Sequence, residues 1–265
     1  MKLTLIITTF NRPESLLLVF ESIKIQTFLP SEIIIADDGS FNETTDLIKS
    51  FKQNSNLNIT HVWQENIGFR ASRSRNNAIL KSTGDYIVLI DGDVILHNNF
   101  IKDHIICAEP GYFIQGTRVL LSEKNTIKAL SNKTIFFSFF TSGLRNRKNS
   151  IHSNLLSKIF LNRKNNIQGI KSCNMAFYKN DCLKINGFNN EFEGWGREDS
   201  EFVVRLMNSG IKRKNVRFNA IQFHLWHNEN TRVLLHKNNA ILEKTINSRS
   251  HWCENGINSL EKNES

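Results

Sequence analysis

The chain has 265 residues, 40% of them hydrophobic and 22% charged, a composition typical of a globular protein long enough to bury a core of its own. Its formal net charge is +9, and the segment 116–170 holds ten Lys and Arg residues against the single acid Glu123, so the excess is local. The four cysteines lack metal-binding spacing, which argues against a zinc module, and no apolar run approaches the roughly 20 residues that span a bilayer.

The first half of the chain alternates two apolar patterns. Runs rich in β-branched residues predict strands, and these cover residues 3–8, 33–36, 58–63 and 86–90. Apolar residues at helical spacing predict helices, and these cover residues 13–26, 42–51 and 71–80. Asn11 is available to cap the first helix, and Pro13 suits its first turn. Strands alternating with helices form βαβ units, so we expect an α/β fold with a mostly parallel central sheet flanked by helices.

The start of the chain is apolar, as in a signal peptide, but Asn11, Arg12 and Pro13 follow instead of a small-residue cleavage site. We therefore interpret it as a buried strand. We expect the four cysteines to be reduced thiols in a cytosolic protein.

The second half of the chain loses the alternation and then regains it. Segment 116–170 joins the basic excess to an aromatic run at residues 136–140, and we interpret it as an insertion or lid. Regular structure returns over 170–178, and the pattern then predicts a helix over 199–208, a strand over 216–223 and a helical tail. We accordingly divide the chain into residues 1–115, 116–170, 171–230 and 231–265.

Polar residues follow three of the predicted strands. Thr8, Thr9, Asn11 and Arg12 end the first, Asp37 and Asp38 end the second, and Asp91, Gly92 and Asp93 end the fourth. Ligands of open α/β sheets bind beyond the carboxyl ends of the strands, so we expect these residues to converge on one edge. No G-x-G-x-x-G follows the first strand, which argues against a dinucleotide-binding Rossmann domain.

Asp91 and Asp93 flank a glycine, and carboxylate oxygens are suited to Mg²⁺ or Mn²⁺ bound together with substrate phosphates. Gly92 permits a tight turn and close approach of a ligand. The alternative is an ordinary surface turn. Asp37 and Asp38 could accept hydrogen bonds from a nucleobase or a ribose, with the same alternative.

The segment 68–76 places Arg70, Arg73 and Arg75 at a helix start, where backbone N–H groups favour anions. For Arg75 we favour a role as helix-surface charge. Trp195 lies between two glycines and suits an exposed platform for a sugar ring. The acids after it could supply a general base, or they could complement the dipole at a helix start. His224 and His227 are suited to completing a metal site, although histidines in pairs are more often structural.

Six motifs occur in a fixed order. They are Thr8-Thr9-Phe10-Asn11-Arg12, Ala36-Asp37-Asp38-Gly39-Ser40, Asp91-Gly92-Asp93, Cys173-Asn174-Met175-Ala176-Phe177, Gly194-Trp195-Gly196-Arg197-Glu198-Asp199 and His224-Leu225-Trp226-His227. Together they resemble the family 2 inverting glycosyltransferases of GT-A fold, the bacterial chondroitin-polymerase type in particular, with a C-terminal motif similar to that of the β-1,4-galactosyltransferases. The resemblance covers about residues 1–230, without the segment 116–170.

The resemblance implies that Asp37 and Asp38 lie at the uracil and ribose of the donor, that Asp91 contacts the donor and that Asp93 binds the metal. The remaining predicted donor contacts are Thr8, Thr9, Asn11, Arg12, Arg70, Asn76 and Gly92. The predicted acceptor contacts are Trp195, Gly196, Arg197 and Asn174, the further metal ligands are His224 and His227, and the catalytic residues are Asp199, as the base, and Glu198. Arg197 stands where the motif usually has glycine and Ser200 where it has an acid, which affects acceptor identity.

We therefore expect a hexosyltransferase dependent on Mn²⁺ or Mg²⁺. It would transfer a hexose or N-acetylhexosamine from a UDP-sugar to a saccharide, free or lipid-linked, in surface polysaccharide or lipopolysaccharide assembly. Residues 1–115 would bind the nucleotide sugar, 171–230 would form the acceptor and catalytic half, and 231–265 a helical tail. We expect a cytoplasmic location, peripheral contact of the basic segment with an anionic membrane, and no nucleic-acid partner.

Two alternatives stay open. A nucleotidyltransferase acting on a sugar phosphate shares the sheet and the acidic metal site, but residues 9–13 lack the phosphate loop it needs. A non-catalytic module that binds an anionic polymer through the basic segment would leave the acidic strand ends unexplained.

Overall fold

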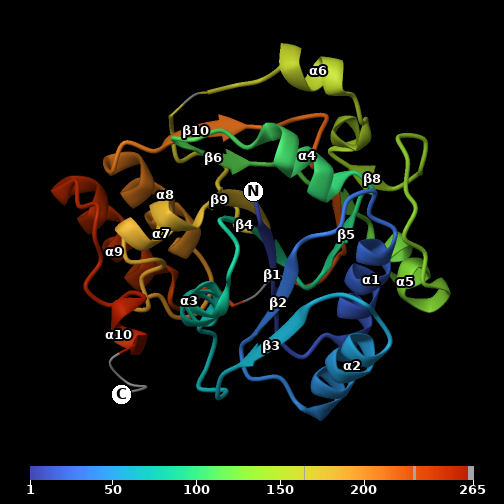
Figure 1. Ribbon diagram of the computed structural model, residues 1–265, viewed down its shortest axis with the longest axis horizontal. Coiled ribbons are helices and arrows are strands. Elements are labelled where there is room, and N and C mark those ends of the chain that lie inside the picture. The colour runs from blue at the N-terminus through green and yellow to red at the C-terminus, as the bar shows by residue number, and fades with distance from the viewer. Residues whose placement is uncertain (164, 229–230, 262–265) are drawn as a thin grey trace.

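The computed structural model describes residues 1–163, 165–228 and 231–261, and two β-sheets organise this part of the chain (Figure 1). The larger sheet has seven strands in the order β10-β6-β9-β4-β1-β2-β3. They are β1 (Leu3–Thr9), β2 (Glu32–Asp37), β3 (Ile59–Trp63), β4 (Tyr86–Asp91), β6 (Tyr112–Gln115), β9 (Asn174–Tyr178) and β10 (Lys212–Asn215). β9 alone runs antiparallel to its two neighbours, β4 and β6. The expected α/β fold with a mostly parallel sheet is confirmed.

Helices cover both faces of this sheet because its strands are apolar on both sides. One face packs against α1 (Pro13–Lys24), α2 (Asn42–Gln53) and α4 (Phe100–Cys107). The other packs against α3 (Ala71–Lys81), α7 (Lys179–Lys184) and α8 (Glu198–Asn208). Figure 1 shows α1 and α2 on one side of β1–β3 and α3 on the other. The predicted strands and helices of the first half are thus confirmed.

The second sheet has the order β5-β11-β7-β8, and β7 and β8 belong to the segment 116–170. Its strands are β5 (Val94–Leu96), β7 (Val119–Leu121), β8 (Leu144–Arg145) and β11 (Gln222–His224). The helices of the segment are α5 (Glu123–Asn132), a 3-10 turn η1 (Arg147–Ser150) and α6 (Asn154–Ile159). Ile95, Val119 and Phe223 form a small core with Leu18 of α1, so the first part of this segment is packed against the rest of the molecule.

The prediction of a single strand over 216–223 is wrong, because a strand ends before this segment and the chain then crosses to the second sheet. β10 ends at Asn215 and β11 begins at Gln222. Between them Phe218 and Ala220 have φ of 64° and 51°, and the left-handed region is incompatible with an extended strand. The N–H of Ala220 instead donates to Asp103 Oδ2 at 2.9 Å.

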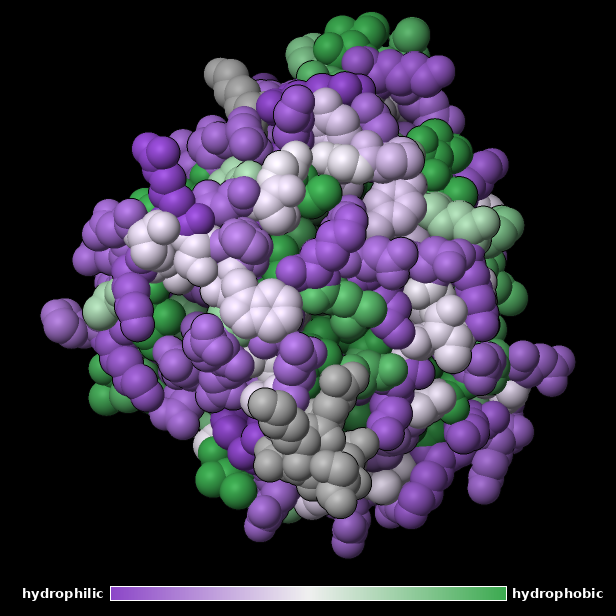
Figure 2. All heavy atoms as spheres, turned by 60° about the vertical axis from the view of Figure 1, so that its left-hand side comes forward, coloured by the Kyte–Doolittle hydropathy of each residue, from purple (hydrophilic) through white to green (hydrophobic). Residues whose placement is uncertain are grey.

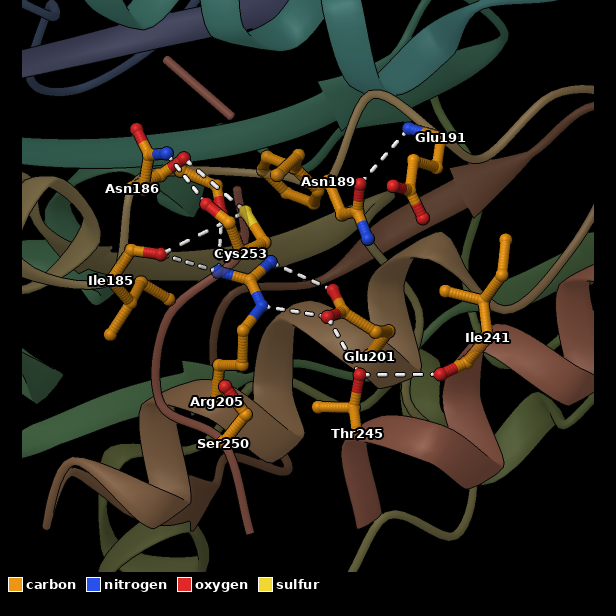
Figure 3. A network of polar contacts seen from close by, with 12 residues as sticks. Ile185, Asn186, Asn189, Glu191, Glu201, Arg205, Ile241, Thr245, Ser250 and Cys253 are labelled. Atoms are coloured by element: carbon orange, nitrogen blue, oxygen red, sulfur yellow. Dashed lines mark hydrogen bonds and ion pairs between the residues drawn. The ribbon is translucent and has the colours of Figure 1, made fainter. Parts of the chain in front are cut away.

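The tail is helical, as predicted, and consists of α9 (Leu235–Ser248) and α10 (Asn258–Glu261). A buried polar network joins α9 to α8 (Figure 3). Arg205 donates to both carboxylate oxygens of Glu201 at 2.7 Å and to the carbonyls of Ile185 and Gly187. Thr245 of α9 donates to Glu201 at 3.2 Å. The network fixes α8, whose first residues are Glu198 and Asp199.

The four cysteines are free and buried, which agrees with the reduced thiols expected from the sequence. None of the helices in the described ranges has the length and apolar character needed to cross a bilayer.

Candidate active site

The carboxyl ends of β1, β2 and β4 meet at one edge of the large sheet. Thr9 is paired with Asp37 across β1 and β2, and Thr8 is paired with Asp91 across β1 and β4. The polar strand ends therefore converge as the sequence predicted. Gly92 follows directly, and its N–H donates to Thr8 O at 2.7 Å. A Cβ at Gly92 would lie 3.0 Å from Thr9 Oγ1, so the close turn leaves little room for a side chain.

Asp93, His224 and His227 form a three-residue cluster beside this turn. β5 pairs antiparallel with β11, which places Val94 opposite His224, and the N–H of Leu225 donates to Asp93 O at 3.0 Å. His224 Nε2 lies 3.6 Å from Asp93 Oδ1, and His227 Nε2 lies 3.3 Å from Asp93 Oδ2. The three ligand atoms lie within 4.8 Å of one another.

The chemistry of this cluster fits a divalent cation. His224 Nδ1 lies 2.7 Å from Leu225 O, and His227 Nδ1 lies 2.7 Å from Asn228 O. A carbonyl has no proton to give, so each Nδ1 carries the hydrogen and, in neutral imidazole, each Nε2 turns a lone pair toward the carboxylate. Asp93 is 8% exposed, and its Oδ1 has no hydrogen-bond donor. Lone pairs that face one another repel, and a cation between them removes the repulsion.

Arg12 also reaches this cluster. Its Nη1 lies 3.2 Å from Asp93 Oδ2, and its side chain is 38% exposed. The Asn11 cap predicted for α1 is wrong: the helix begins after Arg12 without a side-chain cap. Asn11 has φ of 48°, and its Oδ1 accepts a hydrogen bond from the N–H of Phe41 at 2.8 Å. Asn11 therefore connects the ends of β1 and β2 and leaves Arg12 turned to Asp93.

Arg75 is buried at the centre of the site, and its interpretation as helix-surface charge is wrong. It is 4% exposed. Its Nη1 lies 3.2 Å from Glu198 Oε1, its Nη2 lies 3.7 Å from Asp91 Oδ1, and its Nε donates to Thr8 at 3.4 Å. The sequence did contain a signal, because Arg75 is four residues from both Ala71 and Ile79 and so shares their buried face.

The electrostatics of Asp91 and Asp199 follow from this arrangement. Burial raises the pKa of Asp91, the charge of Asp93 adds to the rise, and Arg75 opposes it. Burial also raises the pKa of Asp199, to about 7, with the neighbouring Glu198 adding and Arg75 opposing. Ser200 donates to Asp199 Oδ1 at 3.1 Å. A carboxylate whose pKa lies near neutral pH is suited to accept a proton during a reaction.

Asp37 contacts β3, and Asp38 contacts the loop that follows it. Asp37 is fully buried and accepts from the N–H of Ser40 at 2.8 Å. Its other oxygen lies 2.8 Å from His61 Nε2. Asp38 accepts from the side chain of Gln64 and from the N–H of Arg70, and burial raises its pKa. The Arg70 guanidinium is bonded to Glu65 O. A donor role for these residues remains a prediction.

Asn76 and Asn174 form hydrogen bonds within the protein, and their predicted substrate contacts stay predictions. Both are no more than 1% exposed. Asn76 exchanges hydrogen bonds with the backbone of Phe188 at 2.7 and 2.8 Å. Asn174 donates to Thr117 O and Ala220 O at 2.8 Å. Buried amide side chains near a site can stabilise the surrounding backbone. The sequence alone does not distinguish this structural role from contact with a substrate.

The glycine-flanked tryptophan lies on the surface as expected. Trp195 is 40% exposed, and Arg232 lies 5.2 Å from its ring centroid. Gly194, Gly196 and Arg197 have φ of 69°, 103° and 80°, so Arg197 occupies a left-handed conformation that suits the glycine usual in this motif. Arg197 Nε donates to Asn239 of α9 at 2.7 Å.

Comparisons with known proteins agree with this geometry. The family model described as glycosyl transferase family 2 matches residues 4–171, and one described as N-terminal domain of galactosyltransferase matches residues 157–228. The second match includes the histidines of the cluster, and the first includes Asp93.

Curated relatives and solved structures point the same way. A hyaluronan synthase of Pasteurella multocida is 26% identical over 240 residues, covering 81% of this chain and 24% of the relative. A chondroitin synthase of Escherichia coli is 24% identical over 230 residues, covering 81% of this chain and 33% of the relative. The chain thus spans a third or less of either protein.

The crystal structure of S. aureus TarS 1-349 in complex with UDP has the same fold, with a TM-score of 0.63 at 15% identity over 91% of this chain and 64% of that one. The family model matches more than half of the residues, and the motif order, the sheet topology and the cluster at the strand ends accord with it, so the chain belongs to glycosyl transferase family 2.

Proposed function

We propose that the chain is an inverting, metal-dependent glycosyltransferase that moves a hexose or N-acetylhexosamine from a UDP-sugar to a hydroxyl of a saccharide acceptor. The observation that carries this proposal is the cluster of Asp93, His224 and His227, with two imidazole lone pairs and an unpartnered carboxylate oxygen facing one another. It lies at the strand ends beside Asp91, Arg75 and Asp199.

The cluster would hold Mn²⁺ or Mg²⁺, which supplies positive charge beside the diphosphate of the donor. Arg12 adds a positive charge next to Asp93. Arg75 holds Asp91 and Glu198 together through its guanidinium, so the donor edge and the start of α8 keep a fixed relation. UDP is bound in the TarS structure of the same fold, which supports a uridine donor.

Asp199 would act as the base. Its raised pKa permits it to take the proton from an acceptor hydroxyl as that oxygen attacks the anomeric carbon. A single displacement from the face opposite the leaving diphosphate inverts the configuration. Trp195 is exposed and would stack on a sugar ring. The names of the two relatives, hyaluronan synthase and chondroitin synthase, support polysaccharide assembly as the setting.

A screen of nucleotide sugars with Mn²⁺, Mg²⁺ or EDTA tests this function by thermal stabilisation and by sugar transfer. We expect Asp199→Asn to lower the transfer rate by about 10²–10⁴-fold and to preserve stabilisation by the donor. His227→Ala should abolish the metal-dependent part of the stabilisation. Asp46→Asn and His236→Ala change exposed residues of α2 and α9 and serve as matched controls.

Wild-type turnover in Asp199→Asn would contradict the role of the base, and retention of configuration, seen by NMR of the product, would contradict the single displacement. Release of pyrophosphate in place of the nucleoside diphosphate would identify a nucleotidyltransferase.

We also propose a cytoplasmic location with peripheral contact between α6 and an anionic membrane, which would bring the site to lipid-linked acceptors. Leu155 and Ile159 are 68% and 64% exposed, and Lys158 lies between them. Figure 2 shows hydrophobic residues at the upper edge of a largely hydrophilic face, where Figure 1 places α6. Apolar side chains beside cations favour an anionic lipid surface.

Co-sedimentation with anionic and neutral vesicles tests the membrane contact. The double variant Leu155→Ser/Ile159→Ser should lose binding to anionic vesicles, whereas Ile127→Ser, which changes an exposed apolar residue of α5, should keep it. Equal binding of both variants would contradict the contact through α6.

A further inference from the structure

A cationic cavity lies next to the candidate active site. It has a volume of about 570 Å³, within the roughly 300–1,000 Å³ typical of small-molecule sites. Its walls come from the end of β6, from β10 and from the chain leading into β9. Four of the lining side chains are cations, namely Arg118, Lys171, Arg213 and Arg217, and none of the described lining residues is an acid.

The positive charge of the cavity is not neutralised by carboxylates within the described part of the chain. Arg163 and Lys214, which are nearby in the sequence, both pair with Glu109, at 3.0 and 2.9 Å. Arg118 and Lys171 have no such partner among the residues described. Unpaired cations gathered in one concave surface attract anions more strongly than the same charges spread over a flat surface.

Among the lining cations, Arg213 gives the strongest indication of an anion in the cavity, because its side chain is buried. It is 6% exposed, and its Nη1 donates only to neutral oxygens, those of Asn166 at 2.6 and 3.1 Å and Gln168 O at 2.8 Å. Its Nε has no acceptor. A buried guanidinium without a carboxylate carries a desolvation cost, which an anion in the cavity would offset.

The cavity shares a wall with the metal-ligand cluster. Leu120 lines the cavity and is paired with His224 across β7 and β11. Cys173 also lines it, and Gln222, two residues before His224, donates to Cys173 Sγ at 3.4 Å. The cavity therefore borders the strand that carries His224.

We propose that this cavity is a subsite for a carboxylate or phosphate group on the acceptor saccharide. The inference rests on the proposed glycosyltransferase function. The donor diphosphate belongs at the acidic, metal-binding edge, where a cation is needed to hold it. The cavity holds cations without acids and so suits an anion that comes without a metal. Guanidinium groups bind carboxylate and phosphate in a bidentate manner, which gives specificity for the charged sugar over a neutral one.

Three p-nitrophenyl β-glycosides with the same aglycone test the subsite: the glucoside, the glucuronide and the glucoside 6-phosphate. Their binding to the full chain with UDP and Mn²⁺ is measured by saturation-transfer NMR and titration at low and high salt. We expect one or both anionic glycosides to bind more tightly than the glucoside, with a preference that weakens as salt rises. The better of the two identifies carboxylate or phosphate as the ligand.

In Arg118→Gln/Arg217→Gln we expect the preference for the anionic glycoside to fall about 10-fold, with affinity for the glucoside unchanged. Arg213→Gln tests the buried cation separately, so a folding defect in one variant does not decide the result. Lys128→Gln removes one exposed cation of α5 and is the control for net charge.

A wild-type chain without preference for either anion would overturn the subsite, as would a preference that survives both variants. A loss of UDP affinity in Arg118→Gln/Arg217→Gln would also overturn it, because the cavity would then serve the donor. Hydrolysis of a UDP-sugar, followed in parallel samples of the same protein with Mn²⁺, tests the proposed function itself. No hydrolysis by the wild type with anion binding intact would contradict the function and leave the cavity as an anion site.

Discussion

The charge of Arg75 affects the pKa of Asp199, the proposed base. Asp199 has a pKa raised to about 7 by burial and by Glu198, and Arg75 opposes the rise. The carboxylate form is the base, so the proposed reaction needs Asp199 to be deprotonated. Burial favours the protonated form of Asp199 in the folded protein, and this form stabilises the fold at low pH. That contribution to the free energy of unfolding is lost as pH rises from the ordinary pKa of 3.8 through about 7.

The rate of transfer should therefore rise with pH and level off above about pH 7. Arg75→Gln removes a positive charge that lowers the pKa of Asp199, so the inflection should move to higher pH and the rate at neutral pH should fall. The pH profile of kcat/KM at saturating metal measures both effects. Arg73→Gln changes a half-buried arginine of the same helix and should leave the inflection in place. An unmoved inflection in Arg75→Gln would contradict the coupling.

The sequence predicted the roles of residues unevenly. Asp93, His224 and His227 were predicted as metal ligands because six motifs occur in one order, and the structure brings their ligand atoms within 4.8 Å of one another. Metal binding by them stays a prediction. Arg75 was missed because charged side chains on helices usually face solvent, and only the spacing to Ala71 and Ile79 marked its face as buried. The side chain of Asn76 donates to the backbone of Phe188, more than a hundred residues away in the chain, and no local pattern reveals such a contact.

The element that presents the proposed base, α8, is held by its own interior. Arg205 and Glu201 are at most 1% exposed and four residues apart, so their pair lies within one helix face (Figure 3). The bonds from Arg205 to the carbonyls of Ile185 and Gly187 tie that face to the turn after α7. The position of Glu198 and Asp199 thus depends on a network one to two turns further along the helix.

Glu201→Gln should destabilise the fold by about 3–5 kcal/mol, because Arg205 would remain buried without its carboxylate. The paired change Glu201→Leu/Arg205→Met should cost less, since it removes both charges together. Urea denaturation gives these free energies of unfolding. Glu21→Gln breaks a partly exposed ion pair with Lys24 on α1 and should change stability by less than about 1 kcal/mol. A small effect of Glu201→Gln would show that α8 is held mainly by its apolar face.

Elements differ in how far a sequence predicts them. β1, β2 and β4 are long, apolar runs, and their pattern alone identified them. β5, β7 and β11 have three residues each, too few to show a period, and the second sheet was not predicted. The break between β10 and β11 depends on left-handed Phe218 and Ala220, residue types that seldom mark such a turn.

The molecule as a whole combines an N-terminal half that follows local patterns with a C-terminal half defined by long-range pairing. The first half supplies the acids at the strand ends, and the second supplies the histidines, the tryptophan and the proposed base. The fold class could be predicted because it needs only the alternation of strands and helices. The site needed the motifs, since its members come together only when both halves are folded.

The position of β9 has a consequence for how the protein forms. β9 pairs with β4 on one side and β6 on the other, yet it follows both in the chain by more than fifty residues. While the chain leaves the ribosome, β1 to β4 can pair as soon as they appear, but the edge of β4 stays open until residue 178 has been made. An open strand edge can pair with another chain and so favours aggregation, and the histidines of the cluster emerge only after β9.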